Sequence, residues 1–127
     1  MRFIKPTPDS NEDTIQAAFI EQCLLNSRAV PELALFYHIP NEGKRTMAQA
    51  MLMKGLGVKS GVPDLHLPVA RGPYHGFWIE FKTSTGFTSK TQKWWHAQLR
   101  EQCHQVVVCR TVEEAVEAVR GYLFPSV

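Results

Sequence analysis

Residues 10–27 form the first segment in which apolar positions follow helical spacing. Ser10 and Asp13 resemble a helix start. Positions on one side of such a helix would then hold Ile15, Ala18, Phe19, Gln22 and Leu25. We therefore predict a helix over residues 10–27, preceded by an extended arm over residues 1–9, which contain two prolines.

The pattern changes after this helix. Residues 33–39 are rich in strand formers and stop at Pro40, so they predict a strand, and a polar turn over residues 41–45 follows. Residues 46–56 predict a short helix with glycine at its end. Its larger apolar side chains are expected to turn inward and pack rather than bind a partner; they are Met47, Met51 and Leu52.

The second half of the chain alternates strands with helices. Residues 61–67 and 76–82 predict two strands, and Gly and Pro in the loop between them favour antiparallel neighbours. Ser89 begins a predicted helix that runs to Glu101, and residues 105–109 predict a buried strand. Thr111 caps a last helix, whose inner face is expected to hold Val112, Ala115, Val116, Val119 and Leu123.

The resulting order, α-β-(α)-β-β-α-β-α, predicts an α/β fold with helices flanking a mixed central β-sheet. With 127 residues and 44% hydrophobic composition, we expect one domain over residues 10–127. A net charge of +2 does not by itself identify a nucleic-acid-binding protein. Three cysteines without paired spacing fit free thiols in a reducing compartment, and no apolar run is long enough to span a membrane. We therefore expect a soluble, cytoplasmic protein.

Acidic residues stand in both short central strands. Asp64 follows Pro63 in the first strand, and Glu80 lies in the second with Lys82 two residues beyond it. Because side chains alternate along a strand, Glu80 and Lys82 face the same side. If the strands are neighbours, the two carboxylates converge and repel each other unless a cation lies between them. Oxygen ligands favour Mg²⁺ or Mn²⁺, and a lysine beside such an ion could orient a water for attack on a phosphodiester.

The sequence leaves simpler interpretations of these residues open. Glu80 and Lys82 could form an ordinary ion pair on an exposed strand. Glu12, one turn from Gln16, could supply a third carboxylate or serve only the helix dipole. Gln92 could reach a phosphate or a metal-bound water, or it could lie at a solvated helix start.

Basic residues gather in the middle of the chain and indicate one basic face. They are Lys44, Arg45, Lys54, Lys59, Lys82, Lys90 and Lys93. One of the adjacent tryptophans beside Lys93 could stack on an unpaired base, and Trp95 is expected to be the one that faces inward. The five histidines do not show the spacing of a zinc site.

Three segments together resemble the VRR-NUC group of the PD-(D/E)XK nuclease superfamily: residues 57–64 ending in Pro63-Asp64, the run Ile79-Glu80-Phe81-Lys82, and Ser89 with Gln92. Residues 15–16, 38–45 and 106–109 also resemble that family's pattern. The resemblance implies a restriction-endonuclease-like PD-(D/E)XK core and metal-dependent phosphodiester hydrolysis. It implies metal ligation by Asp64, Glu80 and the Phe81 carbonyl, and catalytic roles for Asp64, Glu80, Lys82, Glu12 and Gln92.

The small stand-alone members of this family resemble homodimeric nucleases of phages and bacteria that act on branched DNA such as Holliday junctions. The resemblance thus implies Mg²⁺ or Mn²⁺ as cofactor, double-stranded or branched DNA as partner, and a role in DNA replication, repair or recombination. The residues expected to contact DNA are Lys44, Arg45, Lys59, Lys90 and Lys93. The competing hypothesis is a non-catalytic DNA-binding or assembly module on the same scaffold, whose binding would be indifferent to Mg²⁺.

Overall fold

The computed structural model describes residues 11–40 and 46–126. The arm predicted for residues 1–9, and the predicted DNA contacts Lys44 and Arg45, lie outside these residues. The elements in chain order are helix α1 (Glu12–Asn26), the 3₁₀ helix η1 (Pro31–Leu35), strand β1 (Tyr37–His38), helix α2 (Met47–Gly55), strand β2 (Leu65–Leu67), strand β3 (Gly76–Phe81), helix α3 (Lys90–Glu101), strand β4 (His104–Cys109) and helix α4 (Val112–Leu123). The predicted α/β order is confirmed, with η1 as an addition.

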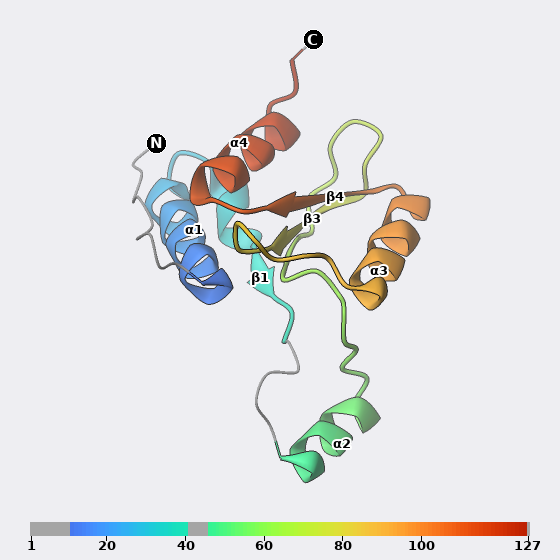
Figure 1. Cartoon of the computed structure of the whole chain (residues 1–127). Helices are drawn as coiled ribbons and strands as arrows, with labels where there is room; N and C mark the ends of the chain where they lie inside the picture. Colours follow the sequence, from blue (N-terminus) through green and yellow to red (C-terminus); the bar gives the residue numbers. More distant parts are fainter. Residues whose placement is uncertain (1–10, 41–45, 127) are drawn as a thin grey trace.

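The four strands form one mixed sheet in the order β1-β2-β3-β4 (Figure 1). β2 is antiparallel to both β1 and β3, whereas β3 and β4 are parallel. The predicted antiparallel pairing of the two acidic strands is therefore confirmed. Parallel pairing of β3 with β4 follows from the crossover through α3, because a helical connection returns the chain to the same end of the sheet.

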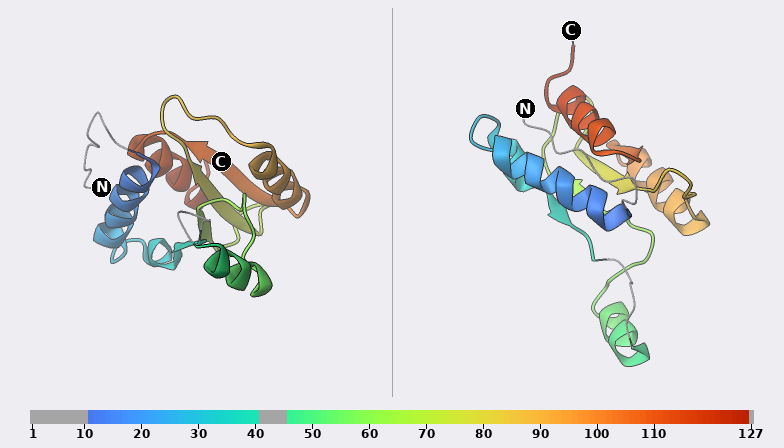
Figure 2. Two further views of the ribbon diagram at one scale, coloured as in Figure 1. Left: turned by 60° about the horizontal axis from the view of Figure 1, so that its bottom comes forward. Right: turned by 60° about the vertical axis from the view of Figure 1, so that its left-hand side comes forward.

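The sheet has a different neighbour on each face. Phe77, Ile79 and Phe81 of β3 belong to the main core together with residues of α1 and α4. Helices α1 and α4 thus cover one face, and α3 lies against β4 on the other (Figure 2). Alternation along β3 turns Trp78 and Glu80 away from the main core, toward the face that α3 covers in part. A buried carboxylate therefore lies on this second face.

The segment 33–39 is not the strand that the sequence predicted. Residues 31–35 form the 3₁₀ helix, and the strand is reduced to Tyr37–His38. Pro31 occupies the start of this helix, where its fixed backbone angle is tolerated and its missing N–H costs nothing. Leu33 alone of η1 is buried. The start of α1 also differs, because Asn11 caps it through the Thr14 N–H in place of Ser10.

Helix α2 is present as predicted, but its side chains do not pack as predicted. Its existence is confirmed, with a capping box between Thr46 and Gln49. However, Met47, Met51 and Leu52 do not turn inward: they are between 65% and 80% exposed, and Leu56 beyond the helix is 76% exposed. Figure 1 shows the reason, since α2 stands apart from the sheet at the end of its connecting segments. None of its described side chains is buried.

Helices α3 and α4 begin where the sequence predicted. Ser89 caps α3, and Thr111 caps α4 through the N–H of Glu114. The inner face predicted for α4 is confirmed as buried, and Tyr122 joins it. In the part of the chain that the structure describes, each helix falls short of the length or the apolar character that crossing a membrane requires.

Candidate metal centre

Three carboxylates meet at one end of the sheet. Glu12 is the first residue of α1, Asp64 directly precedes β2, and Glu80 lies near the end of β3. One oxygen from each lies within 4.8 Å of the other two. Asp64 is buried and Glu80 is only 1% exposed. The structure therefore brings together the three acids that the sequence singled out.

Strand register explains why Asp64 meets Glu80. Leu65 pairs with Ile79 in the antiparallel ladder. Asp64, which precedes Leu65, therefore lies opposite Glu80, which follows Ile79. An Oδ2 atom of Asp64 accepts a 2.7 Å hydrogen bond from the Phe81 N–H. This bond fixes the Asp64 side chain across the end of β3, so its position does not depend on a flexible loop.

Helix α1 is tied to the same corner one turn beyond Glu12. The Gln16 side-chain nitrogen lies 3.0 Å from Nδ1 of His38, and that ring nitrogen lies 3.0 Å from the backbone oxygen of Asp64. Residues four apart share a helix face, so this contact also turns Glu12 toward the carboxylates. Glu12 is consequently part of the acidic cluster as well as a first-turn residue of α1.

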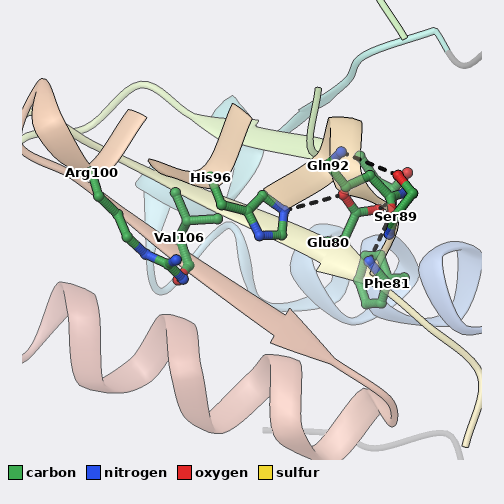
Figure 3. Close-up of polar contacts among 8 residues, drawn as sticks. Glu80, Phe81, Ser89, Gln92, His96, Arg100 and Val106 are labelled. Carbon is green, nitrogen blue, oxygen red and sulfur yellow. Dashed lines mark hydrogen bonds and ion pairs between the residues drawn. The ribbon is translucent and has the colours of Figure 1, made fainter. Parts of the chain in front are cut away.

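Two side chains of α3 reach the Glu80 carboxylate from above the sheet (Figure 3). Nε2 of Gln92 donates to one oxygen and Nε2 of His96 contacts the other, each at 3.4 Å. Gln92 is held by its capping box with Ser89, in which its side-chain oxygen accepts from the Ser89 N–H at 2.8 Å. The predicted proximity of Gln92 to the site is thus present in the structure.

His96 was missed by the sequence analysis. It is buried and contacts Glu80, yet it fits no zinc-type histidine spacing. A usable signal did exist: His96 lies four residues after Gln92 and therefore shares its helix face. Any face of α3 that carries Gln92 to the acidic cluster carries His96 there as well.

Burial and mutual repulsion make these carboxyl groups hard to ionise. Burial raises the pKa of Asp64 to about 7, and the neighbouring Glu80 acts in the same direction, while the Phe81 N–H opposes it. Burial also raises the pKa of Glu80 to about 7, although the hydrogen bond from Asp64 and the charge of Lys82 lower it. Without a cation, ionisation of one of these two adjacent carboxyl groups therefore opposes ionisation of the other. Burial raises the pKa of Glu12 too.

Lys82 directly follows β3, and its N–H donates to the backbone oxygen of Cys109 at 3.0 Å. The residue is buried, and its positive charge acts on both Glu80 and Glu12. The alternative of an ordinary ion pair on an exposed strand is therefore wrong, because Glu80 and Lys82 are both removed from solvent. An amine inside an acidic cluster of this kind can orient or exchange a proton with a nearby water.

Three of the residues predicted to contact DNA are exposed on α3 or on the segment that meets its start, whereas Lys54 lies on the separate helix α2. Lys59, Lys90 and Lys93 are exposed. Gly61 brings the segment of Lys59 against the start of α3: its φ is +90°, and a Cβ there would lie 2.6 Å from the Thr91 side chain. Only glycine satisfies both conditions.

The adjacent tryptophans of α3 separate as predicted. Trp94 is exposed, whereas Trp95 is half-buried. Their rings meet edge to face with centroids 5.3 Å apart. Trp95 is thus the more covered of the two rings, and Trp94 lies on the surface next to Lys93 in the chain.

The donors of this centre suit a hard divalent cation. Glu12, Asp64 and Glu80 supply oxygen, and neither of the buried cysteines belongs to the group. The buried Asp64 and Glu80 and the half-buried Glu12 carry the desolvation and repulsion that raise their pKa values when no cation is present, and a Mg²⁺ or Mn²⁺ ion would offset both. The residues present therefore fit such an ion.

Comparisons with known proteins agree with this geometry. The family model of the VRR-NUC domain matches residues 10–113. A solved structure described as a VRR_NUC domain protein superposes with a TM-score of 0.74 at 26% sequence identity, covering 90% of this chain and 88% of the other. A search of curated proteins gave no match. The matched region includes every residue of the acidic corner.

Proposed function

The chain belongs to the VRR-NUC domain family, and from that premise we propose that it is a divalent-metal-dependent DNA endonuclease that hydrolyses phosphodiester bonds. Membership of this family implies a nuclease-type fold and DNA as the substrate. The observation that supports catalysis is the convergence of Glu12, Asp64 and Glu80, with Lys82 buried beside them. We further propose that residues 10–127 act as a single nuclease domain.

Asp64 and Glu80 would hold the cation, with the Phe81 carbonyl as a further ligand and Glu12 as the third acid. Support for the carbonyl comes from strand geometry: the Phe81 N–H points to Asp64, and the N–H and C=O of one residue in a strand point to the same edge. When bound, Mg²⁺ or Mn²⁺ would neutralise charge on the scissile phosphate and increase the acidity of a coordinated water.

The protein's own groups divide the remaining work. The Lys82 side chain would orient the attacking water, and it would accept a proton as a neutral amine or donate one to the leaving oxygen as an ammonium. Gln92 holds one oxygen of Glu80 in place and can offer its amide to a phosphate or water at the same point. His96 holds the other Glu80 oxygen. Removing these contacts would loosen the metal ligand itself.

DNA would approach over the surface that carries Lys59, Lys90 and Lys93. Lys44 and Arg45, which lie outside the described part of the chain, would make further contacts with it. Lysine and arginine neutralise backbone phosphates without reading sequence. We therefore propose selection by DNA structure, with branched DNA such as Holliday junctions as the preferred substrate. DNA replication, repair or recombination in the cytoplasm of a bacterial or phage-infected cell is the proposed setting.

Cleavage assays on a panel of labelled DNAs test this function. The panel contains supercoiled plasmid, linear duplex, single strands, a flap and a four-way junction, each incubated with Mg²⁺, Mn²⁺ or EDTA. We expect cleavage only with a divalent ion and fastest on the branched substrates. Binding that is unaffected by Mg²⁺, with no cleavage of any substrate, would favour the non-catalytic module instead.

We also propose that the chain is a homodimer joined through α2. The four exposed apolar side chains of Met47, Met51, Leu52 and Leu56 have no cover from the described body of the chain. Such a surface on a helix that stands apart is typical of an interaction site. A second copy would present the same apolar face and bury both, as two-fold symmetric interfaces do. A dimer would also supply two acidic centres, one for each strand of a duplex.

Substituting α2 residues tests the dimer. Met51→Glu with Leu52→Glu places charge in the proposed interface while keeping helix-forming residues, so we expect dissociation to monomers by sedimentation at micromolar concentration. Ala50→Glu is the matched control, because at about 100° per residue it lies on the opposite side of α2. Wild-type protein that sediments as a monomer, or a double variant that still dimerises, would contradict the proposal.

A further inference from the structure

The loop over residues 83–88 carries an exposed aromatic ring. Phe87 is 89% exposed, more than any other large hydrophobic side chain among the described residues. An apolar ring in water forgoes the roughly 1.5–3 kcal/mol that burial of such a side chain provides. Local packing therefore does not account for this phenylalanine.

The loop that presents Phe87 is clamped rather than loose. Nη1 of Arg110 donates to the backbone oxygens of Thr83 at 2.6 Å and of Gly86 at 2.8 Å. The Gly86 N–H also closes a turn onto the Thr83 oxygen at 3.2 Å. Arg110 follows directly after β4, so the clamp joins the loop to the sheet. Phe87 is thus held out in solvent by a fixed backbone.

The same loop borders the acidic centre on both sides. It begins immediately after Lys82 and ends at Ser89, which caps α3 and positions Gln92. A Cβ built on Gly86 would lie 3.6 Å from Cδ of Lys82, so the loop rests on the lysine side chain. Phe87 is the next residue, about 3.8 Å further along the backbone. Phe87 is therefore an exposed residue of the loop that packs against the Lys82 side chain.

Exposed positive charge follows the loop directly in the chain. Lys90 and Lys93 are exposed on the first turn of α3, directly after the loop. A cationic surface that tracks the backbone, together with an aromatic face for a base, is the arrangement by which proteins bind unpaired nucleotides. In a continuous duplex the bases are stacked on one another and offer no free face to such a ring.

We propose that Phe87 is a stacking site for an unpaired nucleobase adjacent to the scissile phosphate, and that Arg110 is a positioning residue that holds the loop for it. The proposal rests on the proposed nuclease function for the place of the scissile phosphate. Because every base has a π face, Phe87 confers preference for an unpaired nucleotide and not for a base sequence. It favours flaps and frayed ends, which offer an unpaired nucleotide, over continuous duplex.

Binding in EDTA tests the site without relying on cleavage. The probe is a duplex with a single-stranded flap whose first unpaired base is 2-aminopurine, a fluorophore that brightens when it leaves a stack of bases. Wild-type protein should bind the flap and change its fluorescence, because the base exchanges its neighbouring base for the Phe87 ring. Phe87→Ala should bind it about tenfold more weakly, with the fluorescence change lost, while binding continuous duplex as well as the wild type does.

Two variants isolate the ring from general effects of substitution. Phe87→Tyr keeps an aromatic face and should restore both affinity and fluorescence. Phe124→Ala removes another exposed phenylalanine, 59% exposed just after α4, and should change neither. Equal flap affinity and equal fluorescence in Phe87→Ala and wild type would overturn the stacking site, as would an equal loss on flap and duplex.

Arg110 is tested through a double-mutant cycle. Arg110→Met should reproduce the loss of flap binding, and it should cause no further loss in the Phe87→Ala background, because it acts through the ring. Fully additive losses would overturn its positioning role. Absence of cleavage by wild-type protein with any divalent ion would overturn the proposed nuclease function, while the EDTA measurements would still decide the stacking site.

Discussion

Glu80→Gln is expected to abolish Mg²⁺-dependent cleavage and to weaken divalent-metal binding by more than about 100-fold. Loss of an outer-shell partner typically costs a metal site roughly 10- to 100-fold, and loss of a ligand costs more. The amide keeps the size of the side chain and can still meet Gln92 and His96, so packing is preserved. Calorimetric titration with Mn²⁺ and a cleavage assay on the same preparation measure the two effects.

The same substitution should stabilise the metal-free protein above neutral pH. In the wild type, the pKa values of Asp64 and Glu80 are raised from 3.8 and 4.5 to about 7. Between about pH 4 and pH 7 the folded protein holds protons that the unfolded chain has released, so the free energy of unfolding falls as the pH rises through this window. Glu80→Gln removes one charge of the pair, so less of the free energy of unfolding should be lost as the pH rises.

Thermal unfolding in EDTA at pH 5.5 and pH 8 shows the difference. Wild-type protein should have a lower Tm at pH 8 than at pH 5.5, and Glu80→Gln should depend less on pH and exceed the wild type at pH 8. At pH 8, added Mg²⁺ should raise the Tm of the wild type and leave the Tm of Glu80→Gln unchanged. Glu117→Gln, at an exposed ion pair with Arg120, is the control and should behave as the wild type. A Tm of Glu80→Gln below that of the wild type at pH 8 would contradict the electrostatic strain inferred here.

Lys82→Met is expected to lower kcat by about 100-fold or more, the range that a positioned acid or base contributes. Methionine retains most of the apolar stem that occupies this buried position. Divalent-metal affinity should fall only modestly, since the lysine is not a ligand, and KM for DNA should change less than kcat. This separation distinguishes a role in the chemical step from a role in metal or DNA binding.

Single-turnover cleavage with saturating Mg²⁺ measures that rate, and Mn²⁺ titration of the same variant measures the affinity. Arg28→Met removes an exposed positive charge from the segment after α1 and should leave both unchanged. Lys82→Met protein that cleaves at the wild-type rate while binding metal would assign catalysis to groups other than this lysine.

The fold was predictable wherever local pattern and tertiary packing agree. The inner face of α4 and the caps Ser89 and Thr111 follow from spacing and side-chain chemistry that act within one or two turns. Segment 33–39 shows the limit, because strand formers there are overridden by Pro31 and by the single buried contact of Leu33. The inward face assigned to α2 failed for a related reason. A short helix with apolar residues looks the same whether its cover comes from its own chain or from a partner.

The acidic corner was predictable in part. Alternation along β3 and the antiparallel hairpin were enough to bring Asp64 to Glu80, and the family pattern added Glu12. His96 and Arg110 were not found, because their roles depend on how α3 and the residue after β4 are placed over the sheet. Such contacts between distant segments leave no local periodicity in the sequence.

The most direct test of the central claim is the anomalous difference map of a crystal grown with Mn²⁺. We expect a manganese peak among the carboxylates of Glu12, Asp64 and Glu80, within about 2.5 Å of at least two of their oxygens. The same map from Glu80→Gln crystals should show that peak lost or greatly weakened. Well-ordered side chains at these three positions, with no anomalous peak between them at millimolar Mn²⁺, would contradict the claim that they form a metal centre.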